Sequence, residues 1–350
     1  MSTRFAKRMI MGALANGLAV DLARKRLSND HAVVLMYHEV VEDSADIESW
    51  TAIKVSDLKR QLDYLGRHYD IVSMDDALAR LRKPGGAQRP AAVVTFDDGG
   101  KGNATTLLPL IDAVKVPVTI YVATGHIETQ QPYWFDRLIN ALQVESEFSV
   151  DLRRFDGLDD YIFNRVRGGD NWLEYDRLLA GIKKLPPSTY DDIVATIVQQ
   201  TARHTPRHGP RLVPMTIDDL GRVARSPYIT IGGHSHCHTL QTRLSPTARA
   251  DSLETNRRLL REWTGQPVDH FAYPSGDLDD DVVAAVKACG YVSAVSTAHQ
   301  VWRPGCDEFR IPRFGIGRYD ALPTFRAGLV GGPRSLVNLL IRPGKEAHAA

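Results

Sequence analysis

The chain reads Ala91-Ala92-Val93-Val94-Thr95-Phe96-Asp97-Asp98-Gly99 close to the end of its first hundred residues. The stretch opens with four small or branched apolar residues, which is typical of a buried strand, and it ends with two carboxylates and a glycine. Polar side chains that directly follow a strand lie at its carboxyl end, where open α/β sheets and α/β barrels build their sites. The stretch therefore predicts an α/β fold with a functional site behind this strand.

A second apolar run, Tyr228-Ile229-Thr230-Ile231, is followed by a cluster of histidines, His234, His236 and His238. One carboxylate and two imidazoles suit a divalent cation that keeps coordination positions open, as catalytic zinc does. We therefore predict Asp98, His234 and His238 as metal ligands. Side chains alternate along an extended segment, so Asp97 points elsewhere and is free to accept a proton from metal-bound water. His236, two residues from either histidine ligand, is expected to project elsewhere, behind the ligands or into solvent.

Composition narrows the class of protein. The 350 residues are 43% hydrophobic and 24% charged, which suits one large α/β domain and gives no sign of disorder. A formal net charge of +1 provides no field that would collect nucleic acid, so we expect no nucleic-acid partner. Three cysteines without a framework spacing do not indicate an oxidising compartment. We expect a cytoplasmic protein.

The amino-terminal segment qualifies this expectation. Its apolar run, residues 9–20, is too short to span a bilayer and lacks a convincing cleavage site. We interpret residues 4–27 as a basic amphipathic helix. Such a helix either rests on the inner face of the membrane, as a peripheral contact, or packs on the domain.

Apolar runs of strand length alternate with segments of helical periodicity, which predicts βα units and a mostly parallel sheet. The expected strands are 32–37, 69–73, 91–96, 117–122, 228–233, 268–273 and 291–296. The expected helices are 55–67, 75–82, 103–114, 245–263 and 279–289. The periodicity by itself does not distinguish a barrel from an open sheet.

The distance between the two motifs exceeds what two βα units need at about 30 residues each, so an insertion must separate them. We expect it to be mainly helical, with one short strand near residues 148–152. The predicted organisation is a basic amino-terminal segment at 1–30, a catalytic domain formed by 31–126 and 215–320, an insertion at 127–214 and a carboxyl-terminal tail at 321–350. The insertion either caps the edge of the domain or lines its groove.

A third segment, Phe271-Ala272-Tyr273-Pro274, completes a pattern. Thr-Phe-Asp-Asp-Gly, then His-Ser-x-x-His, then an aromatic-Pro pair resembles the polysaccharide deacetylases of carbohydrate esterase family 4, the NodB homology domain. The resemblance runs from about Ala32 to about Gly317, with the insertion as an interruption. It implies a distorted (β/α)7 barrel whose groove opens at the carboxyl ends of the strands.

The resemblance also implies roles for single residues. The backbone N–H of Tyr273 is the implied oxyanion donor, and Asp97 is the implied base. Many relatives hold this base with an arginine from the third segment, which is absent here, so we expect Arg313 to take its place, with Arg310 as the second candidate. Gly100 stands where many relatives have tyrosine.

The general acid is the most open assignment. Many relatives supply a histidine near the carboxyl end, for which His299 is the candidate, but its surroundings match poorly. A subgroup of bacterial exopolysaccharide deacetylases takes this histidine from a Tyr-His pair after the first strand, and Tyr37-His38 matches that pair. We favour His38, because an imidazole near neutrality suits proton donation.

The resulting hypothesis is a metal-dependent hydrolase, with zinc as the expected ion. It would act on C–N amide bonds other than peptide bonds and remove N-acetyl groups from a polysaccharide or oligosaccharide that contains N-acetylhexosamine. The expected partner is therefore an acetylated glycan. Two alternatives stay open: a carbohydrate O-acetyl esterase, since the same groups hydrolyse esters, and a catalytically silent glycan-binding protein on the same fold.

Overall fold

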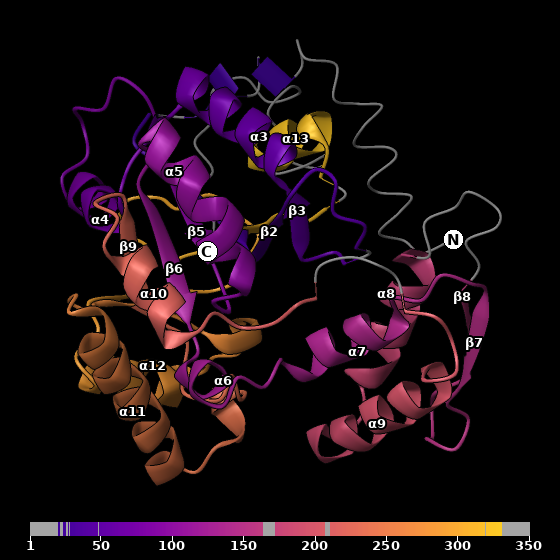
Figure 1. Ribbon diagram of the computed structural model, residues 1–350. Coiled ribbons are helices and arrows are strands. Elements are labelled where there is room, and N and C mark those ends of the chain that lie inside the picture. The colour runs from indigo at the N-terminus through magenta and orange to yellow at the C-terminus, as the bar shows by residue number, and fades with distance from the viewer. Residues whose placement is uncertain are drawn as a thin grey trace.

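The computed structural model describes residues 20–330, apart from 22, 23, 26, 28, 48, 164–171, 207–210 and 319. Most of the amino-terminal helix expected at 4–27 lies outside the described residues, so its membrane contact and the cellular location stay predictions. No helix in the described part is long and apolar enough to cross a bilayer. Figure 1 shows a sheet wrapped by helices and, beside it, a smaller group of helices with a two-stranded ribbon.

One parallel sheet organises the larger part of the chain. Its strands are β1 (Ala32–Tyr37), β4 (Asp70–Ile71), β5 (Ala91–Phe96), β6 (Val118–Val122), β9 (Ile229–Gly233), β10 (His270–Ala272), β11 (Ser293–Val295) and β12 (Phe314–Gly315). The order across the sheet is β11-β10-β9-β6-β5-β1-β12, and β4 pairs with the start of β5. All six residues of β5 are buried, as expected of a strand covered on both faces.

The sheet curls until its two ends approach each other. Ile311, just before β12, forms a parallel bridge with Val295 of β11, while Phe314 pairs with Leu35 of β1. The segment 311–315 therefore connects the last strand to the first. The predicted distorted (β/α)7 barrel is confirmed, and the seven expected strands are all present, some of them shorter by up to three residues.

Four of the helices that cover the sheet begin at a residue whose side chain caps the first turn. The side chains of Ser73, Thr216, Ser245 and Asp279 each accept a backbone N–H from the first turn of the helix that follows. The helices are α3 (Val55–His68), α4 (Met74–Arg82), α5 (Leu108–Val114), α6 (Thr124–Thr129), α10 (Ile217–Ala224), α11 (Pro246–Thr264), α12 (Asp280–Ala288) and α13 (Leu322–Leu329). A π-helical turn, η1 (Asn103–Leu107), precedes α5, and short 3-10 turns lie at η2 (Pro187–Thr189), η3 (Gln241–Arg243) and η4 (Pro274–Gly276).

Within the predicted tail, α13 packs against α3, and Phe325 is buried with its ring 6.1 Å from that of Tyr64. Periodicity did not predict α6, α10 or α13. It also missed the two-stranded sheet of β2 (Glu39–Val41) and β3 (Ala52–Lys54), because three-residue strands are too short to show alternation.

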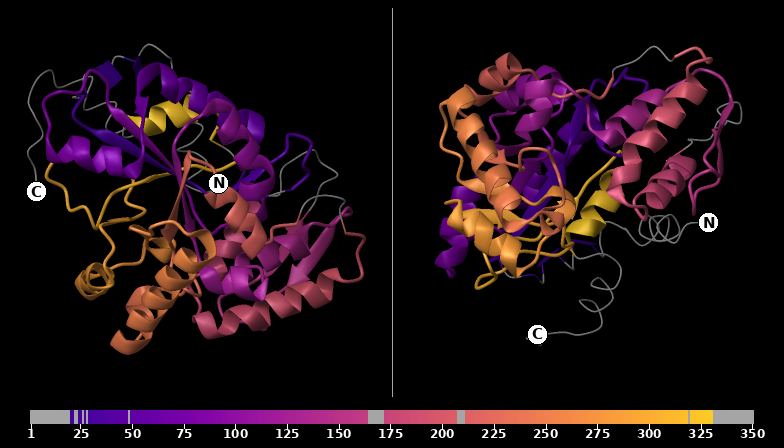
Figure 2. Two further views of the ribbon diagram at one scale, coloured as in Figure 1. Left: turned by 60° about the vertical axis from the view of Figure 1, so that its left-hand side comes forward. Right: turned by 90° about the horizontal axis from the view of Figure 1, so that it is seen from below.

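The insertion has a hydrophobic cluster of its own. Its elements are α7 (Trp134–Leu142), β7 (Phe148–Asp151), β8 (Asp160–Phe163), α8 (Trp172–Ile182) and α9 (Tyr190–Thr201). Leu138, Phe163 and Ile197 belong to this cluster, which also includes Val41 and Ala52 from β2 and β3. The views in Figures 1 and 2 show these elements beside the barrel. The proposed boundaries at 127 and 214 stay a prediction.

Two glycines in helical surroundings give a test of this packing. A Cβ on Gly102 would overlap the Glu39 carboxyl and the backbone carbonyl of Val40, whereas a Cβ on Gly66, inside α3, would meet nothing within 4 Å. Gly102→Ala should therefore lower the free energy of unfolding by about 1–3 kcal/mol. Gly66→Ala should raise it by about 0.5–1 kcal/mol. Urea denaturation of both variants measures this difference, and equal shifts would contradict the packing described around η1.

Candidate metal and catalytic site

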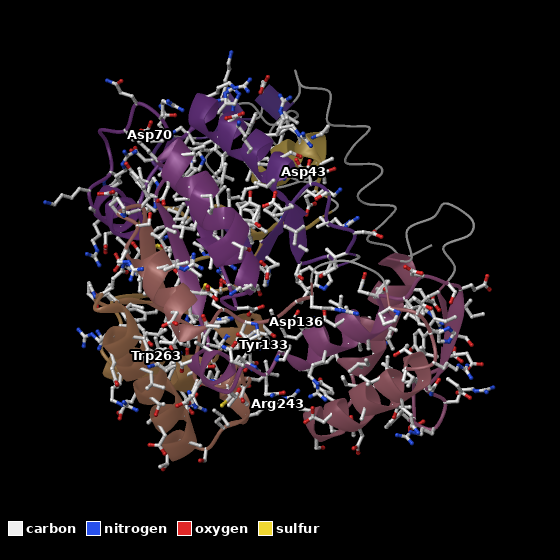
Figure 3. All side chains as sticks on the ribbon, viewed as in Figure 1. Asp43, Asp70, Tyr133, Asp136, Arg243 and Trp263 are labelled. Atoms are coloured by element: carbon white, nitrogen blue, oxygen red, sulfur yellow. The ribbon has the colours of Figure 1, made fainter. Side chains whose placement is uncertain are left out.

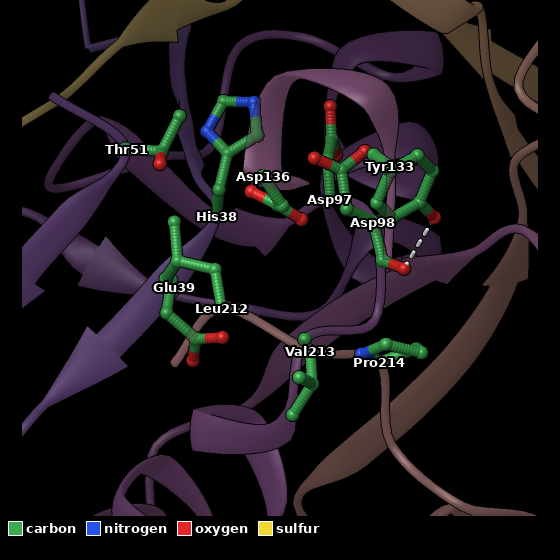
Figure 4. A pocket seen from close by; sticks show the side chains of 11 residues that line it. His38, Glu39, Thr51, Asp97, Asp98, Tyr133, Asp136, Leu212, Val213 and Pro214 are labelled. Atoms are coloured by element: carbon green, nitrogen blue, oxygen red, sulfur yellow. Dashed lines mark hydrogen bonds between the residues drawn. The ribbon is translucent and has the colours of Figure 1, made fainter. Parts of the chain in front are cut away.

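Asp97 and Asp98 follow β5 directly and diverge because the backbone turns between them. Asp98 has φ 74° and Gly99 has φ 71°, so two consecutive residues are left-handed. An aspartate tolerates this region better than most side chains, and such strain is often found at functional sites. The carbonyl oxygen of Asp98 accepts a hydrogen bond of 2.7 Å from the hydroxyl of Tyr133, which anchors the turn (Figure 4).

The histidine motif follows β9 and is also held by an unusual backbone. Ser235 and His238 have φ values of 62° and 54°. The side chain of Asn256, buried on α11, accepts the N–H of His234 at 3.1 Å and donates to the carbonyl oxygens of Ser235 and Val122 at 2.7 and 2.9 Å. Asn256 therefore ties the histidine loop to the end of β6. Sequence reasoning missed it, because an asparagine within a helix is usually a surface residue.

The three predicted ligands meet. Oδ1 of Asp98 lies 3.4 Å from Nε2 of His234 and 3.4 Å from Nε2 of His238. The candidate ligand atoms of the three residues all lie within 4.8 Å of one another. Two ligands that each bind zinc at about 2.0–2.1 Å in tetrahedral geometry are separated by about 3.4 Å. The spacing fits a small divalent ion.

The polar atoms of Asp98 and His234 are also positioned to bind an ion. Oδ1 of Asp98 is buried and has no hydrogen-bond donor within the described chain. Nδ1 of His234 lies 2.7 Å from the carbonyl oxygen of Ala272, which orients Nε2 toward Asp98. An unsatisfied buried carboxylate oxygen is costly unless something binds it. The donor set therefore fits a divalent metal.

Burial and neighbouring charges favour the metal-binding protonation states of Asp98 and His238, but not that of His234. Burial lowers the pKa of His238 to about 3. Burial alone would raise the pKa of Asp98, but the imidazole of His234, whose Nε2 lies 3.4 Å from Oδ1, and that of His238 hold it below its usual range. Burial lowers the pKa of His234, but the Asp98 and Asp97 carboxylates raise it above the usual value. Protons therefore compete with a metal for His234 as the pH falls, which makes binding weaker at low pH.

Asp97 is held by the arginine that the sequence suggested. Arg313 is completely buried and donates two hydrogen bonds of 2.7 Å, one to each carboxylate oxygen of Asp97. Burial would raise the pKa of Asp97, but the guanidinium of Arg313 more than offsets this and keeps the pKa below its usual value. Arg310, the second candidate, instead forms ion pairs with Asp280 and Asp307. The geometry suits a base, and the catalytic role stays a prediction.

The two candidate acids differ in position. His38 follows β1 and lines the same pocket as Asp97 and Asp98, and its buried Nδ1 has no hydrogen-bond partner among the described residues. Its ring meets Trp50 edge-on at 5.4 Å. His299 is exposed, contacts the ring of Phe314 at 4.7 Å, and does not line the pocket. The arrangement favours His38.

Tyr273 differs from the expectation. Its backbone N–H donates to the carbonyl oxygen of Val295 at 3.2 Å, and its hydroxyl donates to the carbonyl oxygen of Phe309 at 2.9 Å. The pairing between β10 and β11 continues one residue beyond Ala272, and this extra hydrogen bond uses the amide. The amide of Tyr273 is therefore already paired in this structure, and its role as the oxyanion donor stays a prediction.

The pocket in front of these residues is small and includes acids that the sequence did not suggest. Its volume is about 20 Å³, and the lining residues are His38, Glu39, Thr51, Asp97, Asp98, Gly100, Tyr133, Asp136, Leu212, Val213 and Pro214. Burial raises the pKa of Glu39 to about 8. Burial, followed by the charge of Asp98, also raises the pKa of Asp136 well above its usual value. Figure 3 labels Tyr133 and Asp136 where the insertion meets the barrel.

Glu39 also accounts for the unusual glycine. A Cβ at Gly100 would overlap the Glu39 carboxyl, whose Oε1 accepts the N–H of Val40 at 3.1 Å. The larger residue that many relatives carry here would therefore clash with Glu39. The glycine at position 100 and the buried Glu39 therefore depend on each other.

Comparisons with known proteins agree with this picture. A family profile described as polysaccharide deacetylase matches residues 184–294, which include His234 and His238. The resemblance to polysaccharide deacetylases that the motifs predicted is confirmed. The match begins after Asp97 and Asp98, inside the interval that separates the two motifs. No curated protein sequence matches the chain significantly.

Solved deacetylase structures share the fold. The deacetylase PplD from Streptococcus pyogenes, in complex with acetate, is 13% identical, with 85% of this chain and 98% of that chain covered and a TM-score of 0.55. IcaB from Ammonifex degensii is 17% identical, with 85% of this chain and 97% of that chain covered and a TM-score of 0.55. A de-N-acetylase from Aggregatibacter actinomycetemcomitans is 14% identical, with 86% of this chain and 100% of that chain covered and a TM-score of 0.52. Together with the family profile, they support carbohydrate deacetylation.

The metal cluster gives the first test of the site. His234→Ala should lose most of its bound metal, because it removes one of three protein ligands. His236→Ala should keep its metal, since Nδ1 of His236 instead lies 2.9 Å from the hydroxyl of Thr124. Metal content of the two proteins, purified after growth with zinc, measures the difference. Full metal content in His234→Ala would rule out this cluster as the metal site.

Proposed function

We propose that this protein is a metal-dependent deacetylase that hydrolyses the N-acetyl group of N-acetylhexosamine units in a polysaccharide or oligosaccharide. The observation that carries the proposal is that Asp98, which forms a three-residue cluster with His234 and His238, lines one pocket together with the separate carboxylate of Asp97 and the imidazole of His38. Zinc is the proposed ion, because the cluster combines one carboxylate with two imidazoles at tetrahedral spacing.

The protein's own residues have distinct tasks in this reaction. A divalent ion held by the cluster would lower the pKa of a water molecule and polarise the acetyl carbonyl. Asp97 accepts the proton of the attacking water, and its two hydrogen bonds with Arg313 keep the carboxylate oriented. His38 donates a proton to the sugar nitrogen as the C–N bond breaks, which releases acetate and a free amine.

The surroundings of the pocket support a glycan substrate. A cavity of about 400 Å³ adjoins the catalytic pocket and shares Glu39 and Leu212 with it. This size lies within the range of about 300–1,000 Å³ that is usual for small-molecule sites. Polar groups suited to sugar hydroxyls line it, among them Ser44, Thr105 and Thr106. Trp50, 43% exposed beside His38, offers an aromatic face for a sugar ring.

The base assignment requires a test that separates chemistry from stability. Asp97→Asn should lower kcat by about 10²–10⁴-fold, since an amide does not accept the proton. It also leaves the buried guanidinium of Arg313 without its counter-charge, which costs up to about 3–5 kcal/mol of stability. The double variant Asp97→Asn/Arg313→Met should regain part of this stability and remain inactive. Kinetics and urea denaturation measure both effects, and near-normal turnover in the folded single variant would place the base elsewhere.

The acid assignment depends on the leaving group. His38→Asn should lower kcat by about 10²–10⁴-fold on an N-acetyl sugar, because the departing amine needs a proton. The leaving group of an activated acetyl ester departs without protonation, so hydrolysis of such an ester should change far less. His299→Asn is the matched control and should behave as the wild type on both substrates. A selective amide defect in His299→Asn, with His38→Asn unaffected, would reverse the assignment.

A further inference from the structure

The insertion contributes a carboxyl group to the catalytic pocket. Asp136, in the first turn of α7, lines this pocket together with His38, Asp97 and Asp98. In Figure 4 its side chain lies between those of Glu39 and Asp98. The mechanism above gives it no task. The inference developed from it rests on the proposed function.

The two additional acids of the pocket are not equivalent. Glu39 is occupied, because Oε1 accepts a backbone N–H and the carboxyl packs against Gly100 and Gly102. The described residues give Asp136 no hydrogen bond and no ion pair. The next residue on α7, Arg137, forms its own ion pair of 2.8 Å with Asp191 of α9. The acceptor atoms of Asp136 are therefore available to a ligand.

The size of the pocket limits which part of a substrate reaches Asp136. With about 20 Å³ of free space against about 400 Å³ in the adjoining cavity, the cavity is the better place for the sugar ring. The acetamido group that reacts then faces the pocket. This group has one hydrogen-bond donor, its N–H, whereas an acetyl ester at the same position has none. A carboxyl keeps at least one acceptor oxygen in either protonation state.

We propose that Asp136 is a specificity residue that accepts a hydrogen bond from the N–H of the scissile acetamido group and so selects N-acetyl over O-acetyl substrates. The nitrogen gains positive charge as it is protonated and departs, so the hydrogen bond becomes stronger in the transition state. An ester does not form it. A site built to bind an N–H discriminates against an analogue that lacks one, because its own acceptor then stays unpaired.

The test compares amide and ester hydrolysis in Asp136→Leu, which removes the acceptor. The variant should lose about 10–100-fold in kcat/KM on an N-acetylglucosamine oligomer and less than about 3-fold on an O-acetylated sugar. Asp136→Asn, which retains one acceptor oxygen, should lie between the wild type and Asp136→Leu on the amide. Asp191→Asn removes one exposed charge from the same insertion and should change neither activity.

Stability separates a specificity residue from a structural one. Because Asp136 has no partner within the described protein, Asp136→Leu should unfold at the same urea concentration as the wild type or a higher one. Equal losses on amide and ester, no loss on either, or a marked fall in stability would each overturn the proposal. A wild-type protein that hydrolyses neither substrate would instead refute the proposed deacetylase function.

Discussion

The buried ion pair between Asp97 and Arg313 is the interaction on which the site and the barrel both depend. The two residues are 216 positions apart in the sequence, and both side chains are buried. Arg313 also donates to the carbonyl oxygen of Ser296 and to the hydroxyl of Thr95, each at 3.0 Å. One guanidinium thus joins β5, the segment after β11 and the segment that closes the barrel. Since an unpaired buried charge is costly, the barrel closes in the register that brings the two charges together.

The insertion belongs to the site as much as the barrel does. Tyr133 reaches the turn of Asp98 through its hydroxyl, while its ring contacts His238 at 5.2 Å and stacks on Phe135 at 5.1 Å. Asp136 follows one turn later. These contacts fix the start of α7 relative to the candidate ligands, so the insertion lines the groove, one of the two alternatives that the sequence left open.

Much of the fold and the chemical centre could be predicted because both depend on local patterns. Apolar runs such as 91–96 and the periodicity of 55–67 report strands and helices directly, and the two short motifs carry their ligands at strand ends. Tyr133, Asp136 and Asn256 could not be found this way, since their role comes from contacts between distant segments. The pairing of the Tyr273 amide was not expected either, because sequence does not reveal how far β10 continues to pair with β11.

The position of Arg313 has a consequence for the order in which the molecule is completed. During synthesis at roughly 5–20 residues per second, about 10–40 seconds pass between the appearance of Asp97 and that of its counter-charge. Until then the nascent chain holds a carboxylate that cannot be buried cheaply, and the first and last strands have no connecting segment. The carboxylate of Asp97 is therefore made in the first third of the chain and is fixed only when the segment near residue 313 appears, so incomplete chains lack this ion pair.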